Sequence, residues 1–365
     1  MPLKTLTGRH YDARKGRGAG ANPEGRFEAT TRAAYDDGWT EGHENGELPA
    51  LKTHVTAERA RSIVSRNQSP DIPFTQSINP YQGCEHGCIY CYARPSHAYR
   101  NLSPGVDFET RLFAKVNAAE LLREELSRPG YRCEEITIGA NTDPYQPIER
   151  QWKVTRGILE VCAEFGQPVS IVTKNALVER DLDILAAMAA RNLVQVFISC
   201  SNLDHELARR LEPRCSAPRR RLEAMRCLSD ADVPVGVLVA PVIPFLTDHQ
   251  IEAVLEAGRD HGARQAGYVL MRLPWEVKAL FEDWLERHYP LKAKHVMSRV
   301  HEMRGGRDND PRFGTRMRGE GQLALLLAQR FRAACAKLGY DAEKRRTLDT
   351  TQFRPPGQQT QLPLF

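Results

Sequence analysis

Three cysteines, Cys84, Cys88 and Cys91, lie within one short segment at the spacing Cys-x3-Cys-x2-Cys. Thiolates bind soft metals and iron–sulfur clusters, and three of them this close in sequence can wrap one face of a four-iron cluster. Such a cluster would keep one iron without a protein ligand, where another molecule can bind. Gly83 and Gly87 favour a tight loop around a cofactor, because glycine weakens helices and suits turns.

Two other interpretations of this segment stay open. The three cysteines occupy positions i, i+4 and i+7, which share one face of a helix, so an amphipathic helix is one alternative. A zinc site that uses His86 together with the cysteines is the other. Structural zinc usually takes two ligand pairs separated by a longer loop, and no second pair follows in this sequence.

The segment from Cys84 to Cys91, with Tyr90 directly before the third cysteine, resembles the signature of the radical S-adenosylmethionine (radical SAM) superfamily. Tyr92 and later segments resemble more narrowly its spore photoproduct lyase-like branch, the so-called DNA repair photolyases. The resemblance implies a [4Fe–4S] cluster on Cys84, Cys88 and Cys91, with S-adenosylmethionine (SAM) on the open iron. It implies an enzyme that cleaves SAM to a 5′-deoxyadenosyl radical, using a reductant such as flavodoxin or ferredoxin. The cofactors carry that chemistry, and the protein positions and shields them.

Residues 73–274 alternate between strand and helix patterns, which predicts an α/β domain. The predicted strands are residues 77–81, 135–139, 168–173, 193–199, 233–240 and 267–272. The predicted helices are residues 112–126, 153–165 (closed by Gly166), 181–190, 206 onward and 248–257. Six strand–helix units predict parallel strands with right-handed crossovers, too few for a closed eightfold barrel. The resemblance implies an open, partial (β/α)6 TIM-like barrel of the radical SAM type with a helical C-terminal extension.

Compact polar residues follow the predicted strands, at 141–143, 173–175 and 199–202. The carboxyl ends of parallel strands lie at one edge of a sheet, where ligands bind, so these residues predict a ligand-facing rim. Ordinary loop polarity and helix capping would give a similar pattern. The resemblance implies that the following residues contact SAM: Tyr90, Tyr92, Thr142, Asp143, Lys174, and Ser199 or Ser201.

One position departs from the branch. Spore photoproduct lyase has a cysteine after the second strand that returns a hydrogen atom to the product radical, and Asn141 stands at the matching place. An amide has no weak S–H bond to donate. Cys200, one strand end further on, is a candidate relocated donor or a small buried thiol. The remaining cysteines show no paired spacing and are predicted to be structural: Cys133, Cys162, Cys215, Cys227 and Cys335.

Three segments flank the predicted barrel. Residues 1–72 show little periodicity and predict an irregular N-terminal extension. Residues 275–346 predict a basic helical region, with helices at 275–288, 293–303 and 322–337. Residues 347–365 predict a flexible tail that ends in Gln361-Leu362-Pro363-Leu364-Phe365. These five residues resemble the pentapeptide with which bacterial DNA polymerases and repair proteins dock into the sliding clamp; the alternative is a tail end that folds back onto the body.

Positive charge concentrates near the C-terminus. Residues 299–346 hold 12 Lys or Arg against 6 Asp or Glu, in a chain whose net charge is only +5. This excess is compatible with nucleic acid and equally with a solvated helical surface. No aromatic stripe separates the arginines of the Gly-rich stretch, so a stacking platform for single strands is not predicted. Those arginines are candidates to follow a phosphate backbone, or are solvated loop charges: Arg304, Arg307, Arg312, Arg316 and Arg318.

The composition excludes several classes of protein. No stretch is long and apolar enough to span a membrane, and the N-terminus lacks the apolar core of a signal peptide. Nine cysteines, an odd number in a long chain, do not indicate a disulfide scaffold. These features predict a reduced, cytoplasmic protein with no membrane partner.

Together these features predict a radical SAM enzyme that acts on DNA, in repair or modification. One alternative is a radical SAM enzyme that modifies a protein or RNA. Another is a clamp-docked DNA-binding protein whose cluster is structural or senses redox state. Formation of 5′-deoxyadenosine on reduction separates an enzyme from a sensor.

Overall fold

The computed structural model describes residues 16–28, 51–340 and 346–355. Its strands are β1 (His54–Glu58), β2 (Val64–Arg66), β3 (Gln76–Ile78), β4 (Tyr81–Gln82), β5 (Arg111–Lys115), β6 (Ile136–Ile138), β7 (Val169–Thr173), β8 (Val194–Ser199), β9 (Val235–Val242) and β10 (Gln265–Leu270). Its α-helices are α1 (Asp107–Thr110), α2 (Ala118–Leu126), α3 (Glu149–Trp152), α4 (Val154–Phe165), α5 (Leu182–Ala190), α6 (His205–Leu211), α7 (Pro218–Asp230), α8 (Ile251–Asp260), α9 (Glu276–His288), α10 (Pro290–Glu302), α11 (Thr315–Arg318) and α12 (Gly321–Leu338). Short 3-10 helices lie at η1 (Arg94–Arg100), η2 (Ala176–Asp181) and η3 (Asp248–Gln250).

The main sheet is 7-stranded, in the order β10-β9-β8-β7-β6-β3-β2. Strands β3 and β6 to β10 pair in parallel with their neighbours, and β2 runs antiparallel to β3 at one edge. Strand β7 is almost entirely buried along a run of Val, Ser, Ile, Val and Thr, as expected for a strand covered on both faces. The predicted α/β fold with its parallel strands is therefore confirmed. Among the described strands, β10 and β2 are the sheet's edges, so the sheet is open there.

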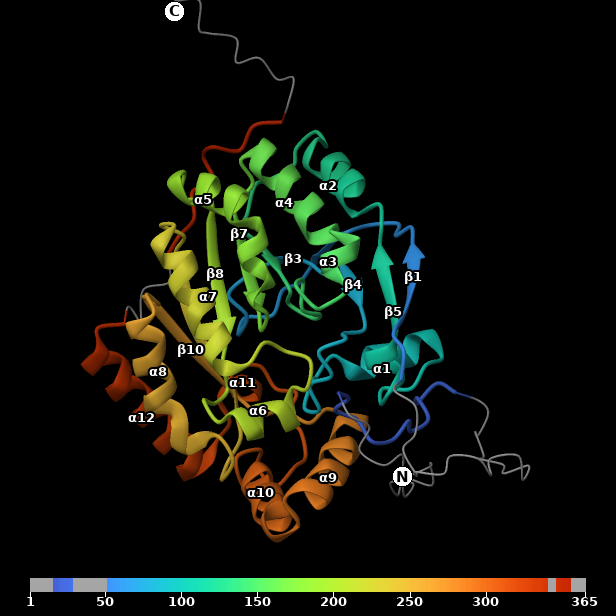
Figure 1. Ribbon diagram of the computed structural model, residues 1–365, viewed down its shortest axis with the longest axis vertical. Coiled ribbons are helices and arrows are strands. Elements are labelled where there is room, and N and C mark those ends of the chain that lie inside the picture. Colours follow the sequence, from blue (N-terminus) through green and yellow to red (C-terminus); the bar gives the residue numbers. More distant parts are fainter. Residues whose placement is uncertain (1–15, 29–50, 341–345, 356–365) are drawn as a thin grey trace, which may run out of the picture.

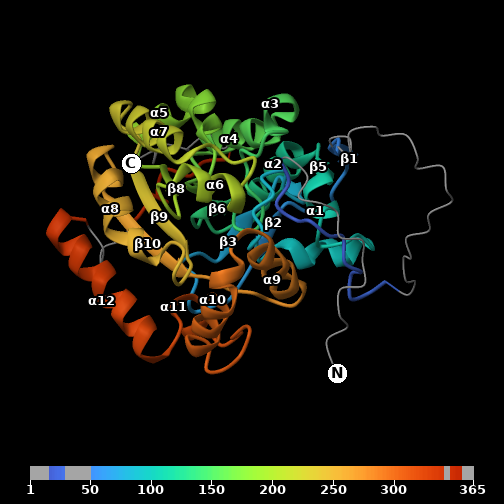
Figure 2. The same cartoon turned by 60° about the horizontal axis from the view of Figure 1, so that its bottom comes forward.

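Helices α4, α5, α7 and α8 lie along one side of this sheet, in the connections between consecutive parallel strands (Figure 2). The sheet and these helices share one hydrophobic core. In α4, for example, Ile158, Leu159 and Cys162 are fully buried. Gly166 ends α4 in the left-handed conformation, at φ 65°, as the sequence predicts.

Two expectations for the first third of the chain are wrong. The helix predicted over residues 112–126 is strand β5 followed by the shorter α2. Burial in β5 alternates between Leu112 and Ala114, which are buried, and Phe113 and Lys115, which are half-buried; this is the period of a strand. Residues expected to be irregular form β1 and β2, because β1 pairs with β5 and β2 pairs with β3. Partners distant in sequence, absent from the local pattern, decide these segments.

The predicted C-terminal helices are present as α9, α10 and α12. Helices α9 and α10 lie at the end of the sheet toward which β8 runs (Figure 1). Around Trp284 of α9 they form a second hydrophobic core, which also contains Ile89 and Tyr90 of the cysteine loop. In the part of the chain that the structure describes, no helix has the length and apolarity needed to cross a membrane.

Candidate active site

The cysteine-bearing segment forms a tight loop. No α-helix covers residues 83–93, so the helical alternative fails for these described residues. Gly83 and Gly87 have φ of +76° and +68°, a conformation that disfavours other residues. A Cβ at Gly87 would lie 2.7 Å from a carboxylate oxygen of Glu109, so the loop also needs glycine for space.

A buried arginine holds this loop from behind. Arg94 donates to the carbonyl oxygens of Cys88 at 2.9 Å and Gly87 at 3.1 Å, and to the Glu109 carboxylate at 2.6 Å. Glu109 also accepts hydrogen bonds from the backbone N–H groups of Gly18 and Ala19, at 3.0 and 2.8 Å. The short described part of the N-terminal extension therefore supports the cysteine loop, although its sequence shows no such role.

The loop closes one side of a cavity of about 240 Å³. The other walls come from the carboxyl ends of the parallel strands, so the rim that the sequence predicts exists. The polar and aromatic residues that line it are Cys84, His86, Cys88, Tyr90, Cys91, Tyr92, Asn141, Asp143, Thr173, Lys174, Ser199 and Arg272.

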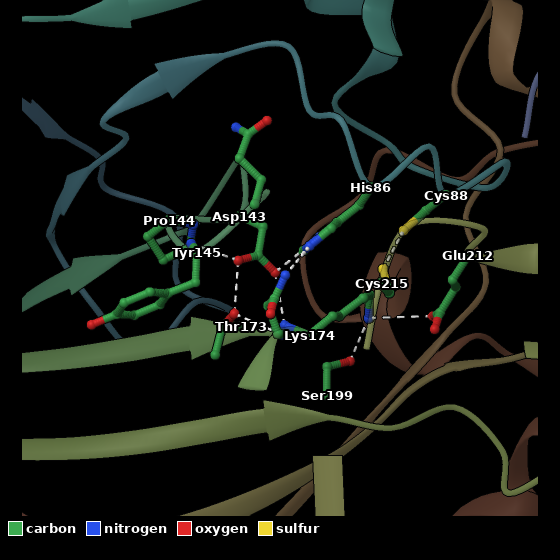
Figure 3. A network of polar contacts seen from close by, with 12 residues as sticks. His86, Cys88, Asp143, Pro144, Tyr145, Thr173, Lys174, Ser199, Glu212 and Cys215 are labelled. Carbon is green, nitrogen blue, oxygen red and sulfur yellow. Dashed lines mark hydrogen bonds and ion pairs between the residues drawn. The ribbon is translucent and has the colours of Figure 1, made fainter. Parts of the chain in front are cut away.

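Asp143 and Lys174 organise the interior of this cavity (Figure 3). The Asp143 carboxylate accepts hydrogen bonds from the Thr173 hydroxyl and the Lys174 backbone N–H, both at 2.7 Å. The Lys174 ammonium donates to the Ser199 hydroxyl at 2.5 Å and to the Ala240 carbonyl oxygen at 3.2 Å. Burial opposes ionisation of Asp143, but His86 and these donors outweigh it and hold its pKa below the usual value.

A second carboxylate, Glu212, lies behind Lys174. It accepts hydrogen bonds from the Tyr90 hydroxyl and the Arg221 guanidinium and lies 3.7 Å from the Lys174 ammonium. Arg221 and Glu212 are both almost fully buried. Burial opposes ionisation of Glu212, but Arg221 and Lys174 outweigh it and keep its pKa below the usual value. Arg221 therefore has a carboxylate partner within the protein, and the same carboxylate lies close to Lys174.

The ring of His86 contacts Asp143 and Asn175 through its two nitrogens and also lies beside the Cys84 thiol. Nδ1 lies 3.4 Å from an Asp143 carboxylate oxygen, and Nε2 lies 3.1 Å from the amide nitrogen of Asn175. The amide oxygen of Asn175 accepts from a backbone N–H at 3.0 Å, which leaves the amide nitrogen as donor to Nε2. Among the described residues, no three or more His, Cys, Asp or Glu side chains are gathered to hold a single metal ion. The zinc alternative therefore gains no support.

The cysteines fit a cluster better than a bare loop. Cys84 and Cys88 are 7% exposed, and Cys91 also lines the cavity. Burial, together with the thiolates of Cys88 and Cys84, raises the pKa of Cys91 to about 12. Iron bound here would supply positive charge that favours the thiolate of Cys91. In a [4Fe–4S] cluster each cysteine binds a different iron, so the sulfur atoms need not converge on one point.

The structure brings only some of the predicted SAM-contacting residues to the cavity. Tyr90, Tyr92, Asp143, Lys174 and Ser199 line it, and so does Asn141, the residue predicted to match the lyase cysteine.

Thr142, Ser201 and Cys200 are buried but do not line the cavity. The Thr142 hydroxyl donates to the Tyr81 carbonyl oxygen at 2.8 Å, and the Ser201 hydroxyl accepts from the Asn202 amide at 3.0 Å. The Cys200 thiol donates to the Asn202 carbonyl oxygen at 3.3 Å. Cys200 sits one residue beyond Ser199, and successive residues of a strand face opposite ways, so its thiol is not placed as a hydrogen donor.

Sequence reasoning missed the residues whose partners are distant in the chain. Glu212, Arg94 and Glu109 carry no local motif, and each looks like an ordinary charged residue. Cys215, predicted to be structural, has its sulfur 3.7 Å from that of Cys88 (Figure 3). Only the fold places this further thiol beside the cysteine loop.

Comparison with known proteins agrees with this geometry. A model of the radical SAM superfamily matches residues 78–258. An uncharacterised protein of Mycobacterium tuberculosis is 37% identical over 234 residues, 64% of this chain and 68% of the relative. An uncharacterised protein of Methanocaldococcus jannaschii is 25% identical over 239 residues, 66% of this chain and 85% of the relative.

Two structures of spore photoproduct lyase share the fold. The lyase complexed with dinucleoside spore photoproduct has a TM-score of 0.56 and 15% identity, over 78% of this chain and 80% of that one. A mutant of the lyase has a TM-score of 0.54 and 16% identity over the same shares. Members of the superfamily use a [4Fe–4S] cluster and SAM. The motif, the cavity and these matches together show that the chain belongs to the radical SAM superfamily, as an enzyme with a spore photoproduct lyase-like fold.

Proposed function

We propose that this radical SAM enzyme acts on DNA, in repair or modification. The observation that carries the enzymatic part is one cavity shared by Cys84, Cys88, Cys91 and the polar ends of successive parallel strands. When bound, the cluster and SAM supply reductive cleavage of SAM and abstraction of a hydrogen atom from the substrate.

In this proposal Cys84, Cys88 and Cys91 hold the cluster. Lys174 and Ser199 offer a cation and a hydroxyl to the oxygen atoms of SAM. Asp143 acts through its hydrogen bonds, because it fixes the backbone from which the Lys174 side chain extends. The walls of the cavity exclude water from the reacting atoms.

The proposed reaction differs from that of a lyase with a thiol donor in how the product radical regains a hydrogen atom. Among the described residues that line the cavity, the only cysteines are Cys84, Cys88 and Cys91. Asn141 is the residue predicted to match the lyase cysteine, and the Cys200 thiol is bonded elsewhere. We therefore infer that no protein thiol returns a hydrogen atom to the product. A return of the hydrogen atom from the cleaved cofactor, which needs no further oxidant, fits this arrangement.

DNA is proposed as substrate on three grounds. The fold resembles that of spore photoproduct lyase, which has been seen complexed with dinucleoside spore photoproduct. Residues 299–346 carry a positive excess. Gln361–Phe365, which lie outside the described residues, resemble a clamp-binding peptide.

Several arginines of the basic region are committed to contacts inside the protein. Arg304 is fully buried and donates to the carbonyl oxygens of Leu270 and Met271, at 3.0 and 2.6 Å. Arg312 pairs with Asp310 at 2.9 Å. These two arginines are structural, which leaves the argument from charge to the exposed Arg307 and Arg318 and to residues nearer the cavity.

The first experiment is anaerobic reconstitution with iron and sulfide, then dithionite and SAM, with 5′-deoxyadenosine as the readout. We expect product from wild type and from Cys227→Ala, a matched control on α7, and none from Cys88→Ala. Product from all three proteins would refute the assignment of the cluster ligand. An intact four-iron cluster without product from wild type would instead favour the redox-sensing alternative.

DNA and the clamp are tested separately. Damaged and undamaged DNA, RNA and protein extracts are each added to the same assay, and stimulation by RNA or protein alone would contradict the choice of DNA. Deletion of residues 361–365 is expected to abolish binding to a bacterial sliding clamp without changing formation of 5′-deoxyadenosine. Unchanged clamp affinity would remove that part of the proposal.

A further inference from the structure

Arg272, two residues after β10, lines the cavity and forms no ion pair with any described carboxylate. Its Nε is buried and has no hydrogen-bond partner among the described residues. One Nη donates to the thioether sulfur of Met317 at 3.6 Å, a weak acceptor, and the guanidinium lies 5.5 Å from the Tyr92 ring centroid. Burial, opposed by Tyr92 and reinforced by Arg316, lowers the pKa of Arg272. Arg272 is half-buried, and a cation taken partly out of water without a paired anion is costly, so this site is suited to an anionic ligand.

The carboxylate that influences Arg272, that of Asp71, is already paired with another arginine. Asp71 lies close enough to influence Arg272 but accepts two hydrogen bonds from Arg316, at 2.7 and 2.6 Å. The Arg316 guanidinium in turn lies 4.8 Å from the Phe313 ring centroid. Arg316 is therefore balanced within the protein, whereas Arg272 is not.

Two aromatic rings accompany these arginines and are open to solvent. Tyr92 is 47% exposed and Phe313 is 57% exposed. The charge of Arg316 influences the pKa values of both Tyr92 and Arg272. The pair of Arg272 with Tyr92 therefore lies near the pair of Arg316 with Phe313. Exposed aromatic faces interleaved with guanidinium groups bind unpaired bases and the phosphates that join them. The sequence hides this pattern, because its members come from the cysteine loop, the end of β10 and the α11 region.

We infer that Tyr92, Arg272 and Phe313 bind single-stranded nucleic acid at the cavity mouth, with Arg316 supporting the Phe313 ring; these four residues are here called the aromatic–arginine rim. Arg272 takes a phosphate. This inference rests on the proposed function and names how the substrate is held. A guanidinium fork matches two phosphate oxygens, and a base must leave its duplex to reach a small cavity.

The position of Arg272 distinguishes a substrate phosphate from the carboxylate of SAM. Lys174 and Ser199 already offer polar groups on the cavity floor. Arg272 instead lies over the ring of Tyr92, which is 47% exposed, and contacts Met317 of α11. An acidic peptide could neutralise Arg272, but its carboxylates would not account for the exposed rings of Tyr92 and Phe313.

The test measures binding of a fluorescein-labelled deoxyoligonucleotide of about 12 nucleotides, single-stranded and in duplex form, by anisotropy over a salt series. The proteins are reconstituted wild type, Arg272→Gln, Phe313→Ala and Arg128→Gln. Arg128, after α2, is the matched control, since it is exposed and its one ion pair among the described residues is with its neighbour Glu125 at 2.6 Å.

We expect wild type to prefer the single strand and Arg272→Gln to weaken binding at least about tenfold. The slope of log K against log salt should fall in magnitude by about 0.7, the contribution of one phosphate. Phe313→Ala should weaken binding with an unchanged slope, and Arg128→Gln should match wild type.

Three results would overturn the inference. If wild type binds DNA but Arg272→Gln behaves like Arg128→Gln, the rim is wrong while the proposed DNA substrate stands. If wild type binds no nucleic acid, the proposed substrate and the rim both fail. If Arg272→Gln loses affinity for SAM, measured by equilibrium dialysis, and keeps its affinity for the oligonucleotide, the guanidinium serves the SAM carboxylate.

Discussion

The buried carboxylate of Glu212 allows a direct test of the electrostatics of the cavity floor. A Glu212→Gln substitution keeps the shape of the side chain but removes the countercharge of Arg221 and Lys174. Breaking a buried ion pair costs about 3–5 kcal/mol. Arg221 keeps two backbone carbonyl acceptors, at 2.7 and 2.9 Å, which puts the expected loss near the lower end, about 3 kcal/mol.

The assay is thermal unfolding of reconstituted protein followed by far-ultraviolet circular dichroism. With an unfolding entropy of about 2.1 cal/mol/K per residue, a loss of about 3 kcal/mol lowers the Tm of a chain of 365 residues by about 4 °C. Glu206→Gln is the matched control, because this exposed residue of α6 loses the same charge and only surface ion pairs. Equal Tm values for the two variants would refute the reasoning.

We also expect the loss of stability in Glu212→Gln to depend on pH. Burial alone would raise the pKa of Glu212, but Arg221 and Lys174 hold it below the usual value. A carboxyl group with a lowered folded pKa stabilises the protein above its unfolded pKa, about 4.3, and the stabilisation disappears as pH falls through the folded value. The Tm difference between wild type and Glu212→Gln should be complete near pH 7 and shrink below about pH 4. A difference that does not change with pH would contradict the charged state assigned to Glu212.

Two further predictions concern the cysteine loop. Gly87→Ala should reduce the iron and sulfide bound per chain, because its Cβ would meet Glu109 at 2.7 Å and φ is +68°; Gly306→Ala, with φ +75° and no atom within 4 Å, is the control for backbone strain alone. Equal iron content in the two variants would contradict the steric argument. Cys215→Ala should lower the midpoint potential of the cluster, measured by a redox titration followed by electron paramagnetic resonance, because hydrogen bonds to ligand sulfurs favour the reduced cluster and Cys215 lies 3.7 Å from Cys88. An unchanged potential would show that the thiol contact does not reach the cluster.

The features that the sequence predicts correctly are those with a local signal. The cysteine spacing and its two glycines indicate a tight loop, and φ is positive at both Gly83 and Gly87. Long buried strands such as β8 and β9 are recognisable from their own apolar residues. Because the carboxyl ends of parallel strands lie at one edge of a sheet, the polar residues that follow each predicted strand are enough to predict the rim.

The features that escape prediction depend on partners far along the chain. Strand β5 carries apolar residues whose spacing also suits a helix. It forms a strand because it pairs with β1, from His54 with Arg111 to Glu58 with Lys115, far apart in the sequence. Which residue of each polar strand end faces the cavity depends on the side-chain period near the end, so Asp143 and Ser199 line it while Thr142 and Cys200 do not. The supports of the loop, such as Arg94, are single charged residues that resemble solvated ones until the fold buries them.

The two ends of the cavity differ in how their charges are balanced. On the floor, Glu212 pairs with Arg221 and attracts Lys174, so the polar groups proposed for SAM are held in place before any ligand arrives. At the other end, Arg272 lies beside an aromatic ring and a thioether, and the nearby Asp71 is paired with Arg316. The residues proposed to bind SAM are therefore held by contacts within the protein, whether or not substrate is present. Arg272, in contrast, needs an anion from outside the protein. Under the proposed function, nucleic acid completes the charge balance only when it reaches the position where its hydrogen atom is to be removed.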